Sequence, residues 1–271
     1  MTAKAKQPDH ALRVSLCKLL SEVARDVLSL APDVFDKGND GIDLVTSTDV
    51  ALQEQLTRAL ETLLPGSIAV GEEGYAEPTT PSDVPVWIID PLDGTVNFVA
   101  GLPAYAISVA LLVDGLPVLA AVHDIPHRCT YSALEGGGAF VDDTRLAPRP
   151  TKARLAMLSS GLLSDLAARD PGALVALLKQ YKLRNLGSQA LHLCHAAAGH
   201  VALVASREAR GWDDLAGALI AREAGFTFGS YRPDPTRQPG DEQFSLCASP
   251  DLFDTLAQAL AASGRDSNTG V

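Results

Sequence analysis

Two aspartates that are three positions apart lie between residues 87 and 98. This part of the chain most strongly suggests catalytic or metal-binding chemistry. Asp90 and Asp93 follow a short run of apolar, β-forming residues, and the proline between them shapes the turn. Carboxylates at the end of a strand converge on one place, and a hard cation such as Mg²⁺ prefers oxygen ligands. The residues from Gly94 onward include a hydroxyl and amides that could open a helix and bind an anion. A metal ion between the two acids and that anion would explain the whole segment.

Two other acidic segments could complete such a site. Glu72 and Glu73 follow a short apolar run, which places their carboxylates at a second strand exit. Asp213 and Asp214 stand at the start of a predicted helix. Taken singly, these segments are more simply a solvated loop and a helix cap, and an isolated pair like Asp90 and Asp93 is more often an acidic turn. Three histidines between residues 192 and 200 lack a complementary ligand set, so we expect them in the core or at the surface.

The helices and strands that must position these acids alternate along the chain without a repeat. Apolar residues at helical spacing predict helices over residues 11–30, 48–64, 171–181, 188–198, 212–224 and 251–262. Runs of β-forming residues predict strands over 68–70, 86–89, 105–113, 116–123, 129–135, 155–159, 201–205 and 244–248. Asp114-Gly115 is typical of a tight hairpin turn. We therefore expect an α+β fold of layered sheets and helices, because consecutive strands pair as hairpins.

The length of 271 residues, 46% of them hydrophobic, is enough for one large domain or two intimately packed ones. Residues 142–152 are the best candidate for a boundary, because prolines and mixed charges interrupt the periodic pattern there. We expect an N-terminal α+β part over residues 1–150, which holds Asp90 and Asp93. A C-terminal α/β part over residues 151–271 contributes Asp213 and a substrate loop to the same compact unit. The tail from residue 263 is expected to fray.

The charge balance argues against several classes of partner. There are 33 acidic and 22 basic side chains, a net charge of −11, which disfavours nucleic acid and anionic membrane surfaces. The first ten residues lack the apolar core of a signal peptide, and the apolar stretch over 104–113 is too short to span a bilayer. The four cysteines have neither paired nor zinc-like spacing, so we expect reduced thiols in a cytoplasmic protein.

Five segments of the chain, in order, resemble the inositol monophosphatase family of Mg²⁺-dependent, lithium-sensitive phosphomonoesterases. DLVTSTD at residues 43–49 resembles the family's D-x-V-T-x-x-D, and GEE at 71–73 resembles its G-E-E. DPLDGT at 90–95 is similar to D-P-(I/L)-D-G-T, GSQA at 187–190 to G-S-x-A, and WD at 212–213 to W-D. One match would be weak, whereas five in register are specific. The resemblance implies a layered αβαβα sandwich and a homodimer.

The resemblance also implies roles for individual residues. The first metal would be held by Glu72, Asp90 and the backbone carbonyl of Leu92. The second would be held by Asp90, Asp93 and Asp213, with Glu72 also near a weaker third, so that two to three Mg²⁺ ions bind. The implied catalytic residues are Glu72, Thr95 and Asp49, with Thr95 and Asp49 paired to orient and deprotonate the attacking water. The implied substrate-binding residues are Asp93, Gly94, Thr95, Val96, Gly187, Ser188, Gln189, Ala190 and Asp213.

This chemistry suits a phosphate monoester. The ester is a dianion with a poor leaving group, and two nearby cations activate the water and stabilise the departing oxygen. We therefore expect hydrolysis of a small phosphomonoester such as inositol monophosphate by a metal-activated water.

Departures from the family pattern bear on the substrate. Val96 stands where many relatives have a second threonine, and Gln189 where alanine is frequent, so that a larger amide would narrow or re-specify the pocket. Ser206 stands where inositol-specific members have an acid that contacts sugar hydroxyls, and Glu208 could replace that acid only in a shifted loop. Histidinol phosphate, other sugar phosphates and nucleotide phosphates therefore stay open as substrates.

Two further readings of the sequence differ in class. A haloacid-dehalogenase-like phosphatase would carry D-x-D-G-T near its N-terminus, whereas here two residues separate the acids and Asp90 lies far into the chain. A non-catalytic regulatory binding protein could retain the fold without turnover. The presence of all five separated acids argues against that second reading.

Overall fold

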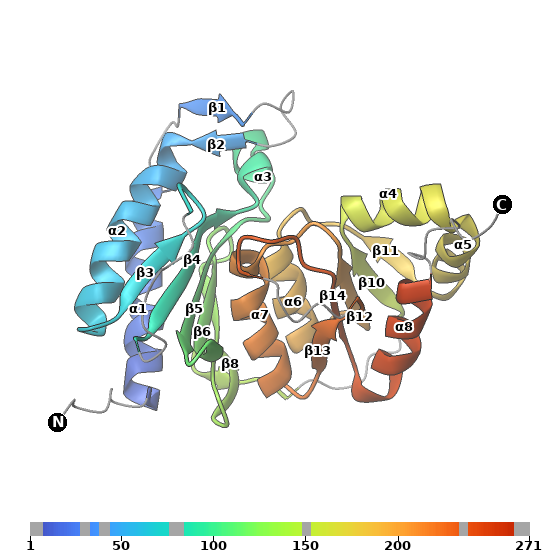
Figure 1. The fold of residues 1–271 in the computed structure, drawn as a ribbon. Helices are drawn as coiled ribbons and strands as arrows, with labels where there is room; N and C mark the ends of the chain where they lie inside the picture. The colour runs from blue at the N-terminus through green and yellow to red at the C-terminus, as the bar shows by residue number, and fades with distance from the viewer. Residues whose placement is uncertain are drawn as a thin grey trace.

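The computed structural model describes residues 8–27, 33–37, 44–75, 84–147, 153–232 and 238–262. Its elements form five layers, seen edge-on in Figure 1: two helices, a seven-stranded sheet, two central helices, a five-stranded sheet and three outer helices. Three clusters of buried apolar side chains fill the spaces between these layers. The layered αβαβα sandwich predicted from the sequence is thereby confirmed.

The first layer consists of α1 (His10–Val27) and α2 (Ser47–Leu63), which cover the outer face of the seven-stranded sheet (Figure 1). Leucines at helical spacing are buried against that sheet: Leu16, Leu20, Leu52, Leu56 and Leu60. A capping box begins α2, because Thr46 Oγ1 accepts the amide of Asp49 while the Asp49 carboxylate accepts the amide of Thr46. This cap satisfies amides at the helix end and holds the Asp49 side chain in place.

One strand of the seven-stranded sheet carries two of the candidate acids at its end. In spatial order it consists of β3 (Ile68–Gly71), β4 (Val86–Asp93), β5 (Ala106–Val113), β6 (Leu116–Asp124), β7 (Cys129–Leu134), β8 (Gly138–Val141) and β9 (Thr144–Arg145). The predicted hairpin turn is confirmed, with φ of 51° at Asp114 and 75° at Gly115, as a type I′ turn requires. The pairing of β4 with β5 shifts register between Asp90 and Asp93. Such an irregularity re-aims side chains at the end of a strand.

The central layer consists of α6 (Gln189–Ala197) and α7 (Gly211–Glu223), which lie between the two sheets (Figure 1). Small residues allow these two helices to approach closely, and a Cβ on Gly217 would lie only 2.5 Å from the Leu193 Cβ. Helix α7 packs on β5, β6 and β7 of one sheet and on β13 of the other. The first turns of both helices lie at the end of β4, because Ser188 and Ala190 hydrogen-bond to Asp93 and a carboxylate oxygen of Asp213 lies within 4.8 Å of one from Asp93.

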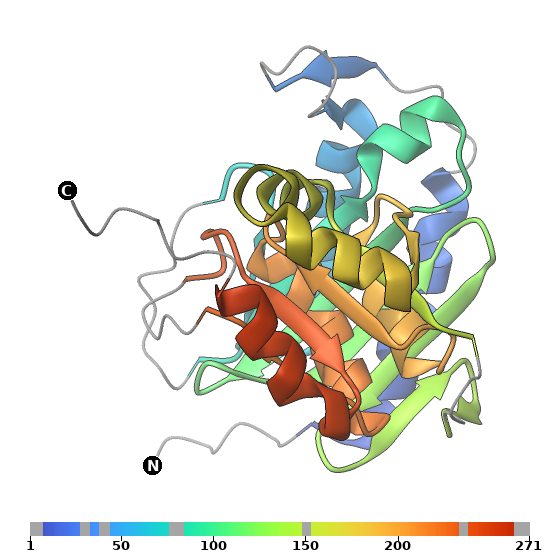
Figure 2. The same cartoon turned by 90° about the vertical axis from the view of Figure 1, so that its right-hand side faces the viewer.

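The five-stranded sheet consists, in spatial order, of β11 (Lys182–Arg184), β10 (Leu155–Leu158), β12 (Leu203–Ser206), β14 (Ser245–Ala248) and β13 (Thr227–Ser230). Its outer face is covered by α4 (Ser160–Arg169), α5 (Pro171–Gln180) and α8 (Pro250–Ala262), which face the viewer in Figure 2. The chain passes from one sheet to the other between Arg145 and Leu155. Of the boundary segment expected over 142–152, residues 148–152 lie outside the described part.

Several short elements were not predicted from the sequence. They include the hairpin of β1 (Val34–Asp36) and β2 (Leu44–Thr46). The six-residue α3 (Thr95–Ala100) begins directly after Gly94, where the sequence indicated that a helix could open. All three residues of β1 are exposed, so this strand lacks the alternating pattern that sequence reading relies on. Helix α4 was also missed. The expected extension of α1 over residues 28–30, the tail from residue 263 and Asp43 of the DLVTSTD segment lie outside the described residues.

Two compositional expectations can be compared with the structure. Within the described residues, no helix is long and apolar enough to cross a membrane. All four cysteines are free thiols, and Cys194 and Cys247 are fully buried. Cys17 and Cys129 are partly buried. The prediction of unpaired cysteines is therefore confirmed.

Candidate metal and phosphate site

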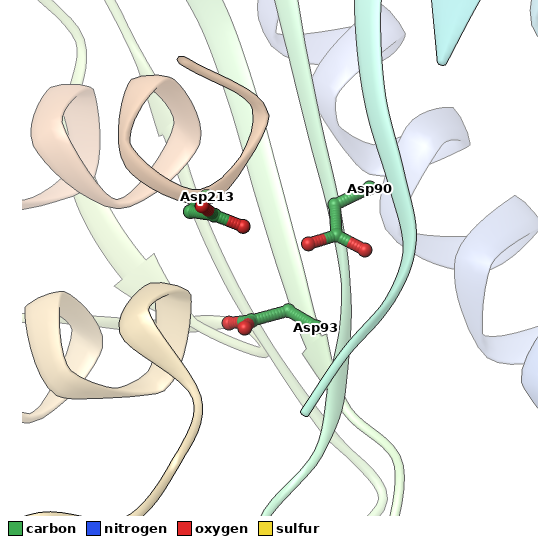
Figure 3. A group of neighbouring side chains, drawn as sticks. All are labelled: Asp90, Asp93 and Asp213. Atoms are coloured by element: carbon green, nitrogen blue, oxygen red, sulfur yellow. The ribbon is translucent and has the colours of Figure 1, made fainter. Parts of the chain in front are cut away.

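Three aspartates from two distant parts of the chain face one space at the end of β4 (Figure 3). Asp90 and Asp93 extend from β4, on the two sides of its register shift, and Asp213 extends from the first turn of α7. One carboxylate oxygen from each lies within 4.8 Å of the others. Among the described residues, these three form the one group of three or more potential ligands at metal-binding separation.

The electrostatics of this cluster favour a bound cation. Asp90 is 1% exposed, and burial raises its pKa well above the usual value, helped by the nearby Glu72, Asp93 and Asp213. Burial likewise raises the pKa of Asp93 to about 6, although hydrogen bonds from Ser188, Ala190 and Gln189 oppose the shift. Buried like charges are costly unless a counter-charge is present. Because every potential ligand atom is a hard carboxylate oxygen, the cluster fits Mg²⁺.

The first turn of α6 holds the Asp93 carboxylate. Ser188 Oγ donates to Asp93 Oδ2 at 2.6 Å, and the Ala190 amide donates to the same oxygen at 2.7 Å. The Gln189 amide donates to Oδ1 at 3.3 Å. Negative charge is favoured at a helix N-terminus, so α6 fixes the orientation of one candidate ligand.

Asp213 both caps α7 and faces the cluster. The backbone amide of Arg210 donates to Asp213 Oδ2 at 2.5 Å, and Arg210 is the N-cap residue of α7. Burial, followed by the nearby Asp93, raises the pKa of Asp213 well above the usual value. The helix-capping interpretation of this residue and the metal-ligand interpretation are therefore compatible.

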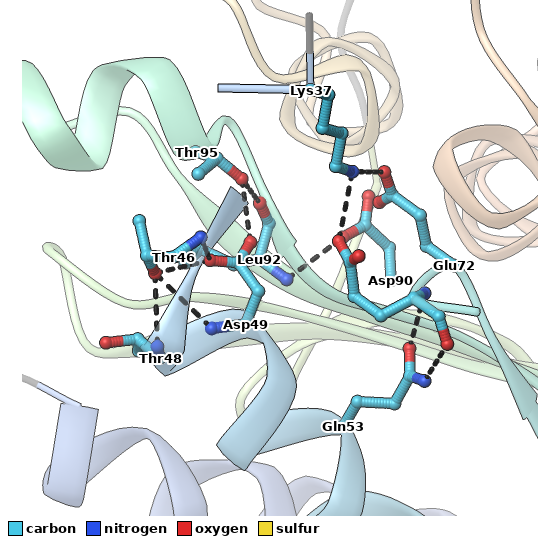
Figure 4. A network of polar contacts seen from close by, with 10 residues as sticks. Lys37, Thr46, Thr48, Asp49, Gln53, Glu72, Asp90, Leu92 and Thr95 are labelled. Atoms are coloured by element: carbon cyan, nitrogen blue, oxygen red, sulfur yellow. Dashed lines mark hydrogen bonds and ion pairs between the residues drawn. The ribbon is translucent and has the colours of Figure 1, made fainter. Parts of the chain in front are cut away.

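Glu72 lies just beyond β3 and is bound by a lysine. Lys37 Nζ lies 2.9 Å from Glu72 Oε1 (Figure 4). It also lies 3.1 Å from Glu73 Oε1. Gln53 of α2 fixes this turn, because its side chain donates to the Glu73 carbonyl at 2.6 Å and accepts the Glu73 amide at 2.8 Å. Burial raises the pKa of Glu72, and Lys37 opposes the shift.

Sequence reasoning missed Lys37 and Gln53. A lone lysine outside any periodic segment gave no signal. Gln53 lies within a predicted helix, where an amide side chain is unremarkable.

Thr95 and Asp49 form the hydrogen-bonded pair that the resemblance implies (Figure 4). Thr95 Oγ1 lies 2.8 Å from Asp49 Oδ1 and 3.0 Å from the carbonyl oxygen of Leu92. Asp49 is 2% exposed, and its Oδ2 accepts the amide and the hydroxyl of Thr46 at 2.9 and 2.5 Å. A carbonyl oxygen has two lone pairs, so Leu92 could accept Thr95 and still contact a cation.

Gly94 allows the chain to turn from β4 into α3. Its φ is +96°, and a Cβ there would lie 2.8 Å from the carbonyl oxygen of Ala104. Asn97 secures the short helix, donating to the carbonyl oxygens of Ala104 at 2.7 Å and Leu186 at 2.6 Å. The backbone after Gly94, including Thr95 and Val96, is thereby fixed beside the acids.

Comparison with known proteins identifies the family. The model of the inositol monophosphatase family matches residues 6–265. An inositol-1-monophosphatase from Mycobacterium bovis is 38% identical over 285 residues, covering 96% of each protein. The chain belongs to the inositol monophosphatase family. Members of this family are phosphoric monoester hydrolases, and the chain is one of them.

Solved structures agree on the fold. An IMPase from Thermotoga maritima has a TM-score of 0.77 and 25% identity, over 92% of this chain and 96% of that one. An IMPase/NADP phosphatase complexed with Mg²⁺ and phosphate has a TM-score of 0.77 and 23% identity, over 94% and 95% of the two chains. Because the second structure is only 23% identical to this chain, its similarity shows the fold alone.

The segment that carries the inositol monophosphatase G-S-x-A pattern lies against the acids. Ser188 and Ala190 contact Asp93, as described above. The side chain of Gln189, expected to narrow the pocket, donates to Asp214 Oδ1 at 2.9 Å. Ser206 is 1% exposed at the end of β12, whereas Glu208 is exposed.

His192 is a buried histidine of α6 with a structural role. Its Nε2 accepts the Leu186 amide at 2.8 Å, which requires this nitrogen to be unprotonated. Burial, followed by the nearby His195, lowers the pKa of His192 to about 4. His192 therefore lies in the core, as the absence of a complementary ligand set indicated.

Acid is expected to destabilise the protein through His192. As pH falls below about 6.5, the unfolded chain takes up a proton that the folded protein excludes. The free energy of unfolding should drop by about 2 kcal/mol between pH 7 and pH 5 from this residue alone. In urea unfolding at both pH values, His192→Gln should lose less stability than the wild type, and His10→Gln, at an exposed position, should match the wild type. Equal losses in His192→Gln and wild type would contradict the assignment.

Proposed function

We propose that the chain hydrolyses a small phosphomonoester of the inositol monophosphate type, using two to three Mg²⁺ ions. The observation that carries the proposal is the cluster of Asp90, Asp93 and Asp213 beside the Thr95–Asp49 pair. A carboxylate cluster that can hold cations and a pair that can accept a proton together suit metal-assisted hydrolysis by water, and here both lie at the end of β4.

The acids would divide between two metal positions. Glu72, Asp90 and the Leu92 carbonyl would hold one ion, and Asp90, Asp93 and Asp213 the other, with Glu72 also near a weaker third. When bound, these ions supply positive charge that acidifies water and neutralises phosphate oxygens. Lys37 already neutralises Glu72 in part.

The remaining residues handle the proton and the phosphate. The Thr95 hydroxyl is fixed by Asp49, so its oxygen can accept a proton from the attacking water while its own proton passes to Asp49 Oδ1. The buried Asp49 is held for this task by Thr46. Backbone amides of Gly94, Thr95 and Val96 would bind the phosphate.

The leaving alcohol is the open part of the proposal. The M. bovis relative is named for inositol-1-phosphate chemistry, which favours inositol monophosphate. Ser206 stands where inositol-specific members have an acid, and it is buried with its hydroxyl accepting the Ala209 amide at 3.3 Å. This position therefore offers no acid to sugar hydroxyls, and histidinol phosphate and other sugar phosphates stay open. The fold neighbour described as an IMPase/NADP phosphatase keeps nucleotide phosphates among the candidates.

Lithium sensitivity and a homodimer belong to the same proposal. A staphylococcal inositol monophosphatase has been solved as a LiCl-soaked inhibitory complex, which supports inhibition by lithium here. Light scattering measures the molar mass of the purified protein, and a homodimer would have twice the mass of a single chain.

The test is phosphate release from a substrate panel. Inositol phosphates, histidinol phosphate, sugar phosphates and phosphoadenosine nucleotides would be assayed with Mg²⁺, with chelator and with added lithium. We expect release that needs Mg²⁺, disappears with chelator and falls with lithium, and the best substrate defines specificity. Phosphate release unaffected by chelator, or no release from any compound, would refute the proposal. The second of these outcomes would favour the non-catalytic alternative.

A further inference from the structure

The mechanism leaves unused a buried carboxylate directly beside the candidate ligand Asp213. Asp214 is 3% exposed. Its Oδ1 accepts the side-chain amide of Gln189 at 2.9 Å, and its Oδ2 accepts the hydroxyl of Ser245. Burying a carboxylate costs stability, and an apolar residue of similar size would avoid that cost. The position therefore requires an explanation other than packing.

Gln189 links two of the candidate ligands through one residue. Its backbone amide donates to Asp93 Oδ1 at 3.3 Å, while its side chain reaches Asp214, the neighbour of Asp213. The first turn of α6, which holds Asp93, is thereby tied to the first turn of α7, which presents Asp213.

Ser245 ties the same carboxylate to the five-stranded sheet. It lies in β14, paired with Ser206 of β12 and Ser230 of β13. Asp214 is thus held from the α6 side by Gln189 and from the sheet by Ser245. Because both carboxylate oxygens of Asp214 are hydrogen-bonded, the first turn of α7 is fixed against rotation.

We propose that Gln189, Asp214 and Ser245 form a positioning network that sets the distance between Asp93 and Asp213, and with it the affinity of the metal position they share. Mg²⁺ demands near-ideal octahedral geometry, so a small rotation of α7 weakens its binding. Hydrogen-bond partners behind metal ligands typically change affinity by about 10–100-fold. The inference rests on the proposed function, because it assumes that these aspartates hold a cation.

The test measures metal binding without substrate. Mn²⁺ would be titrated into wild type and Gln189→Met by calorimetry and by electron paramagnetic resonance, with thermal unfolding in parallel. Methionine keeps the length of glutamine and removes its hydrogen bonds. We expect the dissociation constant of one Mn²⁺ to rise about 10-fold, while the ion that depends on Glu72 binds as before. Ser245→Ala should shift the same ion in the same direction.

A matched control lies at the other end of α7. Glu223 accepts the amides of Gly136 and Gly138 at 2.8 and 2.7 Å, so it ties this helix to the β7–β8 turn. It lies ten residues from Asp213, about 15 Å along the helix. Glu223→Gln should lower the melting temperature and leave Mn²⁺ binding unchanged.

The outcomes separate the inference from the proposed function. A folded Gln189→Met protein with unchanged Mn²⁺ affinity would overturn the positioning role, even if its melting temperature fell. If Gln189→Met does not fold, Ser245→Ala decides by the same criterion. A wild-type protein that binds no Mn²⁺ would refute the metal-dependent function itself.

Discussion

Replacing Asp90 with asparagine is expected to lower phosphate release by at least about 100-fold while stabilising the metal-free protein. Activity falls because Asp90 contributes to both proposed metal positions, and loss of a partner merely behind a ligand already costs about 10–100-fold. Stability rises because Asp90 is buried among Glu72, Asp93 and Asp213. Without a cation, removing one of these charges relieves repulsion worth about 1 kcal/mol.

Thermal unfolding with chelator and with Mg²⁺ checks both effects. Wild type should gain stability from Mg²⁺, and Asp90→Asn should melt higher than wild type in chelator and gain little from the metal. Asparagine keeps an oxygen for the Leu92 amide, which donates to Asp90 Oδ1 at 2.9 Å. Glu54→Gln, at an exposed acid of α2, should change neither quantity. Wild-type activity in Asp90→Asn would exclude the proposed metal site.

Asp49→Asn is expected to lower kcat by about 100-fold or more, with divalent-cation affinity and KM nearly unchanged. An amide cannot accept the proton that Thr95 passes on, and a positioned proton acceptor contributes about 10²–10⁴-fold. Thr95→Ala should cause a similar loss, and the double variant should lose little more, because residues that act as a unit are not additive. Steady-state kinetics and Mn²⁺ titration provide the measurements.

Thr46→Ala separates proton transfer from helix capping in this test. Thr46 caps α2 and donates to Asp49, and its replacement should cost about 1 kcal/mol of stability. It leaves the Asp49 carboxylate in place, so kcat should fall far less than in Asp49→Asn. Losses in Asp49→Asn and Thr95→Ala that multiply in the double variant would show that the two residues do not act together.

Local sequence patterns predicted those parts of the site whose residues lie close together in the sequence. The apolar run before Asp90 and the turn chemistry up to Gly94 are contiguous in sequence, so strand, turn and acids could be read together. Asp49 and Thr95 are 46 residues apart, and only the family resemblance paired them.

Contacts between distant elements escaped prediction. The Gln189 side chain was expected to narrow or re-specify the substrate pocket, and its hydrogen bond to Asp214 was not predicted. That contact depends on how α6 packs against α7, which no pattern within either helix encodes. Lys37 reaches Glu72 from beside the exposed strand β1, for which the sequence offers no periodic signal.

The cluster is divided between strand β4 and the distant helix α7, and this division has a consequence for synthesis. Asp213 comes 120 positions after Asp93, and ribosomes add about 5–20 residues per second. For roughly 6–24 seconds the nascent chain therefore contains Asp90 and Asp93 without their third partner. A truncated chain that ends before α7 contains Asp90 and Asp93 but lacks Asp213. Tight cation binding is therefore expected only in chains that have been synthesised beyond α7.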